Sequence, residues 1–289
     1  MDIKRNTNGN ILYTKEMIDF VVKEYNENKK SFNAIAREQG ESYSTISNIY
    51  HKSGLPVRTD REQAKRYTVN ENYFTVIDTE EKAYWLGFLY ADGYITQKRK
   101  HNGYRVGCSL SAKDIKHLYK LKECLEYTGN IKEYTVINGY KQGTKYCRLL
   151  IASDKMAEDL IKLGCGIQKT NNLKFPSIEQ VPKDFQFPFI RGLIDGDGSV
   201  IISHNSDGYI EYEISFTGTK NMCNSITNIL VGKQFALQKR YKDRNNDNFS
   251  FVISGCNQVK KVLTDLYLNA NIYLDRKYEK AIQILNDGR

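Results

Sequence analysis

The sequence of 289 residues has four prolines, one tryptophan and no long apolar run. A membrane-spanning helix needs about 18 or more consecutive apolar residues, so we expect no membrane partner. None of the six cysteines forms a Cys-x-x-Cys pair, which argues against structural zinc, and we interpret them as reduced, buried thiols. The first ten residues, MDIKRNTNGN, lack the apolar core of a targeting segment. We therefore expect a cytoplasmic protein of a bacterial or phage-type host cell.

The charge balance favours a polyanionic partner. Lys and Arg number 43 and Asp and Glu 34, a net charge of +9. Such an excess is typical of nucleic-acid-binding proteins, but a solvated basic surface is the alternative.

The few prolines divide the chain because proline interrupts both helices and strand ladders. They are Pro56, Pro176, Pro182 and Pro188. We predict a module over 1–66 and two larger segments over 67–177 and 178–289. The two larger segments have the same pattern: a helix ending in Asp-Gly, then alternating hairpins and helices. The expected hairpins lie at about 94–111 and 130–152 in the first segment, and at about 199–217 and 235–254 in the second. This order indicates an internal duplication.

The N-terminal module resembles a helix-turn-helix of the DNA-binding kind. A helix is predicted over Glu16–Asn28, and Ala36, Gly40 and Ile46 have the spacing of two helices that cross through a tight turn. The second helix of the pair would start near Ser42 and enter the major groove. Its candidate DNA contacts are Tyr43, Ser44, Thr45, Ser47 and Asn48. An ordinary three-helix packing unit is the alternative.

Each larger segment opens with an apolar helix that carries small residues four positions apart. The first reads WLGFLYADG over 85–93, with an expected start at Asp78 and a capping box to Glu81. The second reads IRGLIDGDG over 190–198. The small residues, Gly87 with Ala91 and Gly192 with Gly196, would let the two helix backbones approach closely.

If these helices pack together, Asp92 and Asp197 emerge as neighbours at their ends. Two close carboxylates repel each other unless cations lie between them. Oxygen ligands suit Mg²⁺ or Mn²⁺, and paired metal sites can hydrolyse phosphodiesters. A plain C-terminal turn would explain one Asp-Gly motif, whereas one motif in each repeat favours the metal interpretation.

On these motifs, the chain over about 67–289 resembles a single-chain, two-motif LAGLIDADG homing endonuclease. The resemblance implies an α+β fold of tandem αββαββα repeats that form a β-saddle, here preceded by the small all-α helix-turn-helix domain. It implies that Asp92 and Asp197 bind metal, assisted by the carbonyls of Ala91 and Gly196, and that Lys169 and Lys277 assist catalysis. A solvated surface lysine is the alternative for each of the two. Tyr90 departs from the motif at a position that is not catalytic in the family.

The resemblance also implies that the hairpins read DNA, and strand alternation assigns the residues. The candidates in the first repeat are Tyr94, Thr96, Lys98, Lys100, Arg105, Ser109, Lys132, Tyr134 and Arg148. Those in the second are Ser199, Ile201, Ser203, Asn205, Glu211, Glu213, Ser215, Arg240 and Lys242.

The expected activity is metal-dependent double-strand cleavage of a long, asymmetric DNA target by a monomer with pseudo-twofold symmetry. The alternatives are a maturase that binds intron RNA and a DNA-binding regulator that does not cleave.

Overall fold

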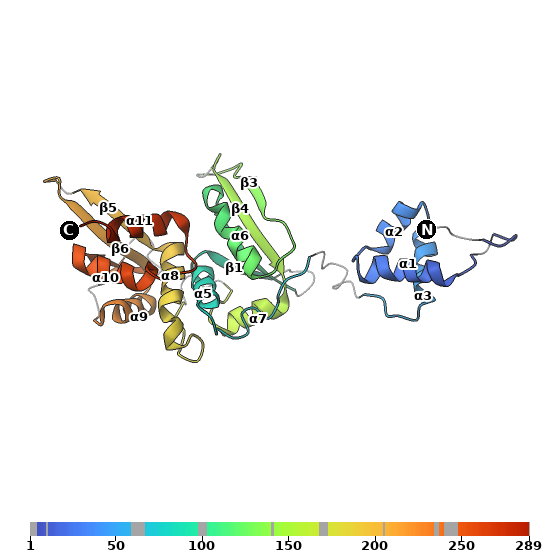
Figure 1. Ribbon diagram of the computed structural model, residues 1–289, viewed down its shortest axis with the longest axis horizontal. Coiled ribbons are helices and arrows are strands. Elements are labelled where there is room, and N and C mark those ends of the chain that lie inside the picture. Colours follow the sequence, from blue (N-terminus) through green and yellow to red (C-terminus); the bar gives the residue numbers. More distant parts are fainter. Residues whose placement is uncertain are drawn as a thin grey trace. The chain divides into compact units, whose positions relative to one another are not determined.

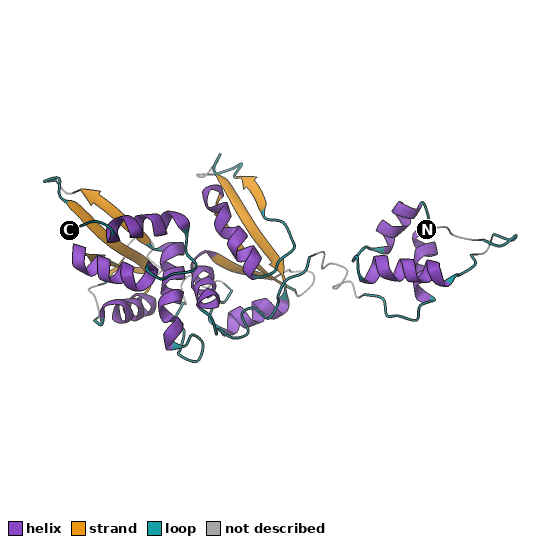
Figure 2. Cartoon of the chain, in the orientation of Figure 1, coloured by secondary structure: helices purple, strands orange, loops and turns teal. Residues whose placement is uncertain are grey.

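The computed structural model divides the chain into two units, Met1–Thr68 and Val69–Arg289, each with its own hydrophobic core (Figure 1). The described residues are 5–9, 11–58, 67–97, 103–139, 142–167, 173–204, 206–233, 237–239 and 248–288. The first unit is helical, and the second combines helices with two sheets (Figure 2). None of the helices within these ranges has the length and apolar character that a membrane crossing requires.

The first unit packs three short helices around a small core. They are α1 (Lys15–Asn26), α2 (Phe32–Gln39) and α3 (Tyr43–His51). Thr14, Ser31 and Ser42 precede them, and each side chain accepts a hydrogen bond from a backbone N–H of the first turn. Gly40 has a φ of 68° at the turn between α2 and α3, where the absence of a Cβ keeps the left-handed conformation inexpensive.

The second unit contains two copies of one succession of elements. The first copy comprises α5 (Glu80–Asp92), β1 (Gly93–Gln97), β2 (Tyr104–Ser111), η1 (Ala112–Asp114), α6 (Ile115–Cys124), β3 (Lys132–Thr135), β4 (Lys145–Ala152) and α7 (Asp154–Lys162). The second comprises η3 (Lys183–Phe185), α8 (Gln186–Asp197), β5 (Ser199–His204), β6 (Ile210–Thr219), α9 (Lys220–Val231), β7 (Gln238–Lys239), β8 (Asn248–Ser254), α10 (Cys256–Tyr267) and α11 (Asp275–Leu285). The antiparallel sheets have the matching orders β1-β2-β4-β3 and β5-β6-β8-β7. The predicted α+β fold with a repeated αββαββα pattern is confirmed.

Helices α5 and α8 form the centre of this unit, and their backbones touch at glycines. A Cβ added to Gly87 would lie 2.0 Å from the carbonyl oxygen of Phe189, and one added to Gly192 would lie 2.1 Å from that of Tyr84. Side chains on nearly every side of α5 are buried, as expected for a central helix. The small residues are therefore what permits this close contact.

The start of α5 differs from the prediction. Thr79, and not Asp78, caps the helix, and its hydroxyl accepts a hydrogen bond from the backbone N–H of Lys82 at 3.2 Å. The expected capping box is wrong, because the Glu81 carboxylate instead accepts a hydrogen bond from the Tyr73 hydroxyl at 2.6 Å. Asp78 forms an ion pair with the Lys82 ammonium.

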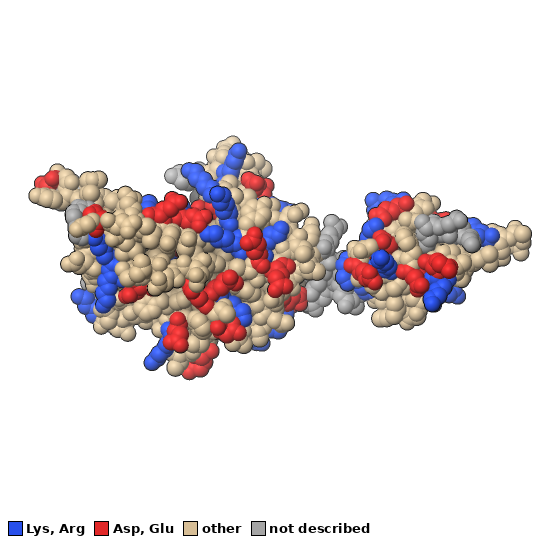
Figure 3. All heavy atoms as spheres, viewed as in Figure 1, with Lys and Arg blue, Asp and Glu red and all other residues tan. Residues whose placement is uncertain are grey.

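Each sheet has one face against helices and one open face. Val106, Cys108 and Leu110 of β2 are buried under helices, as are Tyr212, Ile214 and Phe216 of β6. Positive and negative side chains are intermixed on the face of the molecule drawn in Figure 3. The net positive charge is therefore not gathered into a single patch on that face.

Candidate active site at the paired helix ends

The two motif aspartates are the last residues of their helices. Asp92 ends α5 and Asp197 ends α8, and the chain continues directly into β1 and β5. A Cβ added to Gly196 would lie 2.2 Å from the Ala91 Cβ and 3.3 Å from Oδ2 of Asp92. The Asp92 carboxylate therefore reaches across to the end of α8, and both acids lie at the same end of the helix pair.

An open pocket of about 280 Å³ borders this end. Its lining includes Ala91 and Asp197 of the helix ends together with Thr217, Thr219 and Asn248. Asp92 is half-buried and Asp197 is exposed. The acids thus lie where a substrate can approach from solvent.

The donors at this end are all oxygen atoms, which suits a hard divalent cation. They are the two carboxylates and, one residue earlier in each helix, the carbonyls of Ala91 and Gly196. Among the described residues, no group of three or more His, Cys, Asp or Glu could hold a metal ion. A cation here would keep water or phosphate oxygens as further ligands, as Mg²⁺ commonly does, so the residues present fit such an ion.

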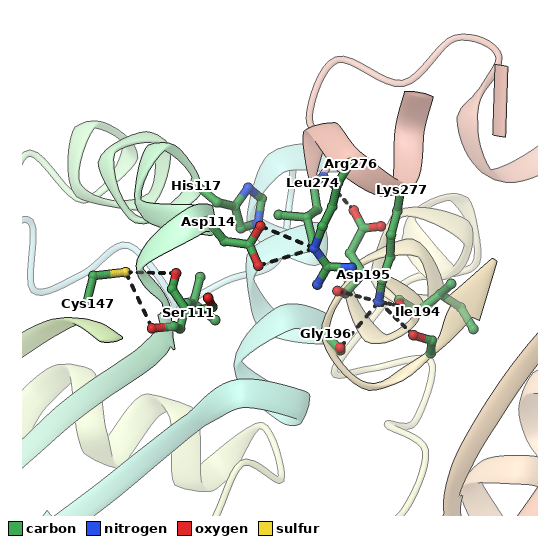
Figure 4. Close-up of polar contacts among 12 residues, drawn as sticks. Ser111, Asp114, His117, Cys147, Ile194, Asp195, Gly196, Leu274, Arg276 and Lys277 are labelled. Atoms are coloured by element: carbon green, nitrogen blue, oxygen red, sulfur yellow. Dashed lines mark hydrogen bonds and ion pairs between the residues drawn. The ribbon is translucent and has the colours of Figure 1, made fainter. Parts of the chain in front are cut away.

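Lys277, expected near the scissile phosphates, has its ammonium enclosed by the last turn of α8. Only 4% of the residue is exposed, so the alternative of a solvated surface lysine is wrong. Its Nζ donates to the carbonyls of Ile194 at 2.6 Å, Asp195 at 2.7 Å, Gly196 at 3.3 Å and Gly198 at 2.7 Å (Figure 4). The Ile194 carbonyl also accepts from the backbone N–H of Gly198 at 3.0 Å, whereas Asp195 and Gly196 are among the last residues of the helix, whose carbonyls lack a partner within it.

Burial is also the main influence on the charge of Lys277. It lowers the pKa of the ammonium to about 8, while the negative charges of Asp195, Asp92 and Asp197 act in the opposite direction. The corresponding residue of the first repeat, Lys169, lies outside the described residues.

A buried polar network that the sequence did not reveal surrounds the helix pair. Asp195 accepts hydrogen bonds from the Tyr84 and Tyr267 hydroxyls, both at 2.7 Å, and from the backbone N–H of Leu274 at 2.8 Å. Burial raises the pKa of its carboxyl. The only sequence feature that could have indicated this role is an acid inside an otherwise apolar motif. Asp195 thus joins α5, α8 and α10 to the start of α11.

His117 extends this network from α6. Its Nε2 lies 3.0 Å from the Tyr84 hydroxyl, whose proton goes to Asp195, so Nε2 carries the ring proton. Burial lowers the pKa of His117 to about 3, and the positive charge of Lys120 and Arg276 contributes. The imidazole is therefore neutral at ordinary pH.

Ion pairs connect the two repeats beside this network. The Arg276 guanidinium contacts Asp114 at 3.2 Å, and the Lys120 ammonium contacts Asp275 at 2.6 Å (Figure 4 shows the first pair). Each pair joins the η1–α6 segment of the first repeat to α11 of the second. These partly exposed pairs add to the contact that the α5–α8 packing makes between the two repeats.

The described candidates of the first sheet share its open face. The register places Thr96 opposite Arg105, and Ser109 opposite Arg148, which in turn lies opposite Lys132. Tyr134 lies opposite Tyr146, a residue missed by the sequence analysis although it is two positions from Arg148. The remaining candidate, Tyr94, lies over Gly107 on the same face. Arginine, lysine and tyrosine therefore gather on one surface.

The open face of the second sheet has a different character. Its rows pair Ser199 with Ser215, Ile201 with Glu213, and Ser203 with Glu211. In β5, β6 and β8, no Lys or Arg side chain lies on that face. Six candidates fall outside the described residues: Lys98, Lys100, Lys169, Asn205, Arg240 and Lys242.

In the N-terminal unit, the predicted contact residues divide between the two sides of α3. Tyr43, Ser44 and Asn48 are exposed and Ser47 is half-buried. Thr45 is 9% exposed and its hydroxyl lies 3.0 Å from that of Ser42, so it faces inward. His51, the last residue of α3, is also exposed.

Comparison with known proteins identifies part of the chain. Residues 79–163 match the family model of the LAGLIDADG-like domain, which confirms the predicted resemblance over that segment. The uncharacterized protein MJ1054 of Methanocaldococcus jannaschii is 26% identical over 227 residues, which cover 75% of this chain. The matched region spans 24% of that relative's length.

Two solved structures are also similar. The I-LtrWI LAGLIDADG homing endonuclease bound to target DNA is 12% identical, with a TM-score of 0.46 and coverage of 74% of this chain and 90% of that one. The LAGLIDADG homing endonuclease I-GzeII in complex with its DNA target is 16% identical, with a TM-score of 0.46 and coverage of 75% and 89%.

Proposed function

We propose that this chain, whose residues 79–163 form a LAGLIDADG-like domain, is a site-specific DNA endonuclease that cuts both strands of a long, asymmetric target. The observation that carries the proposal is the position of Asp92 and Asp197. They lie at one end of a helix pair packed at glycines, beside an open pocket. Two carboxylates at the same end of a helix pair form a negatively charged site that suits divalent cations.

Asp92 and Asp197, with the carbonyls of Ala91 and Gly196, would hold divalent cations, Mg²⁺ or Mn²⁺. When bound, such ions activate water and stabilise the leaving oxygen of a phosphodiester. The chain itself fixes the positions of the ligands. Lys277 holds the end of α8, and Lys169 is the proposed counterpart in the first repeat.

The open sheet faces would bind the duplex on both sides of the acids. Lys132, Arg105 and Arg148 of the first face supply positive charge for phosphates and donors for base edges. The second face carries Glu211 and Glu213, so the two halves present unlike chemistry to DNA. Unlike halves favour an asymmetric target.

The N-terminal unit would add a separate DNA contact. Its helix α3 exposes Tyr43, Ser44 and Asn48, which are short polar or aromatic side chains able to reach phosphates or bases. We propose that this unit lengthens the bound site.

The test is cleavage of a plasmid library with a randomised insert in Mg²⁺, followed by sequencing of the cut ends. We expect defined double-strand cuts in the wild type. Asp92→Asn and Asp197→Asn should each reduce the rate roughly 100-fold or more, because several kcal/mol of metal-dependent stabilisation is lost. Both variants should still bind the selected target.

The matched control is Asp265→Asn, which alters an exposed acid on α10. It should cut at the wild-type rate. Undiminished cutting by the Asp92→Asn, Asp197→Asn double variant would remove these residues from the mechanism. Tighter binding of intron RNA than of any DNA, without cleavage in Mg²⁺ or Mn²⁺, would favour a maturase. Specific DNA binding without cleavage would favour a regulator.

A further inference from the structure

Three residues on the open face of the first sheet form a compact stack, here called the tyrosine–arginine stack: Tyr134, Tyr146 and Arg148. The rings of Tyr134 and Tyr146 are stacked, with centroids 5.9 Å apart and planes inclined by 22°. The guanidinium carbon of Arg148 lies 5.5 Å from the centroid of the Tyr134 ring. Planar guanidinium groups stack favourably on aromatic faces, so this arrangement restrains the arginine.

The protein does not use the hydrogen-bonding capacity of this arginine. Its Nε is buried without a hydrogen-bond partner, and no described residue accepts a hydrogen bond from Arg148. Restrained arginines in folded proteins usually bind a carboxylate or several carbonyls. Here the contact is with the Tyr134 ring, and with Nε buried it is the two terminal Nη groups that remain for a ligand.

The surroundings favour an electron-rich ligand. Lys132 lies directly opposite Arg148 on β3, and Ser109 lies opposite it on β2. Glu133, the acid next to Lys132, pairs with buried Cys147 and therefore belongs to the other face. In the described strands, the stack has no carboxylate neighbour on its own face.

The shape of the donor group suits two kinds of ligand. The planar fork can bind a phosphate through two parallel hydrogen bonds, although a flexible lysine also serves there. A guanine in the major groove presents O6 and N7 as two adjacent acceptors, which match the planar arginine fork. Because the guanidinium of Arg148 is restrained before DNA binds, less conformational entropy is lost when it pairs with a guanine.

We propose that Arg148, oriented by Tyr134 and Tyr146, reads one guanine in the half-site bound by the first sheet. This inference rests on the proposed DNA-binding function and specifies its sequence preference. The two tyrosines are positioning residues, and the arginine makes the base contact.

The experiment selects duplexes from a randomised library by binding to the full chain in Ca²⁺, without cleavage, and sequences the bound DNA. The wild type should require guanine at one position. Arg148→Lys should reduce that preference about tenfold or more, which corresponds to the free energy by which one bidentate contact discriminates between bases. The base preferences at the other positions of the site should not change. Tyr134→Leu should shift the same position in the same direction, whereas Tyr134→Phe keeps the ring and should keep the preference.

Arg37→Lys is the matched control. This exposed arginine lies on α2 of the N-terminal unit, not on the sheet face. It should leave the guanine preference intact. Circular dichroism verifies folding of each variant, which we expect because Tyr134 is 40% exposed.

Two results would overturn the inference. Arg148→Lys or Arg148→Ala could weaken binding of all sequences equally. If the steepness with which the logarithm of affinity falls against the logarithm of salt concentration also decreased by about one, Arg148 would be identified as a phosphate contact. Alternatively, the Arg148 variants could select the wild-type sequence unchanged. Failure of the proposed function has a different outcome, because the wild type would then select no sequence at all.

Discussion

Lys277 holds the end of α8 through hydrogen bonds to carbonyls, including that of Gly196. Lys277→Met keeps the length of the side chain and removes every one of these bonds. We expect the free energy of unfolding to fall by roughly 2–4 kcal/mol, because buried carbonyls lose a charged donor. Urea denaturation measures the change.

The matched control for this lysine is Lys280→Met on the same helix. Its ammonium makes a single long contact, 3.4 Å to the carbonyl of Val200. Lys280→Met should lower the free energy of unfolding much less than Lys277→Met does. An equal loss in both variants would show that the carbonyl contacts of Lys277 contribute little.

His117 gives the protein a stability that depends on pH. Its pKa of about 3 in the folded protein lies below the value of about 6.5 in an unfolded chain. Between these two values the unfolded state binds more protons, so the free energy of unfolding falls as the pH falls. The slope from one such group is at most about 1.4 kcal/mol per pH unit.

His117→Gln keeps an N–H group that can donate to the Tyr84 hydroxyl, and it removes the imidazole that binds a proton in the unfolded chain. Urea denaturation at a series of pH values between about 4.5 and 6.5 should give a flatter dependence than in the wild type. An unchanged slope in His117→Gln would assign the pH dependence to other groups.

At the scale of elements, the glycines that let α5 and α8 pack closely are poor helix formers, so packing and helix propensity favour different residues at these positions. Gly87→Ala should stabilise an isolated helix by up to about 1 kcal/mol. In the folded protein the new Cβ would lie 2.0 Å from the Phe189 carbonyl oxygen, so the helices must separate. We expect a net loss of roughly 1–3 kcal/mol or more, measured by urea denaturation.

Gly166→Ala is the control for this contact. A Cβ at that position meets no atom of the described residues within 4 Å, so stability should change little. If Gly87→Ala were as stable as the wild type, the glycines would not be what brings the helices together.

The elements differ in how far the sequence predicts them. The glycine spacing and the Asp-Gly ends of α5 and α8 are local patterns, and they indicated both the helix pair and the position of the acids. Strand alternation placed Arg148 on the open face, and the same rule applied two residues earlier would have found Tyr146.

Contacts between distant segments could not be predicted in this way. Asp195 is satisfied by Tyr267 and by the backbone of Leu274, more than 70 positions along the chain by their numbering. The burial of Lys277 likewise depends on where α11 packs. The choice of Thr79 over Asp78 as the cap is a competition between adjacent acceptors that the sequence does not resolve.

For the whole molecule, the two open sheet faces differ in charge. Lys132, Arg105 and Arg148 lie on the first, whereas Glu211 and Glu213 lie on the second, where β5, β6 and β8 place no Lys or Arg. Among the described strand residues, those that contribute to the salt-dependent part of DNA binding should therefore lie mainly on the first sheet. The second repeat should contribute selectivity, because a carboxylate near DNA accepts hydrogen bonds only from amino groups such as that of cytosine.

The double variant Glu211→Gln, Glu213→Gln tests this division. Removal of two negative charges should raise the affinity for unrelated DNA by about tenfold near 50 mM salt, and the gain should shrink near 200 mM because the charges are screened. Discrimination within the second half-site should fall, because an amide also donates. Fluorescence anisotropy at both salt concentrations measures the affinities. The control pair Glu158→Gln, Glu279→Gln removes the same charge from exposed positions on α7 and α11. An equal gain in the control pair would assign the effect to net charge alone and not to the face that the two glutamates share.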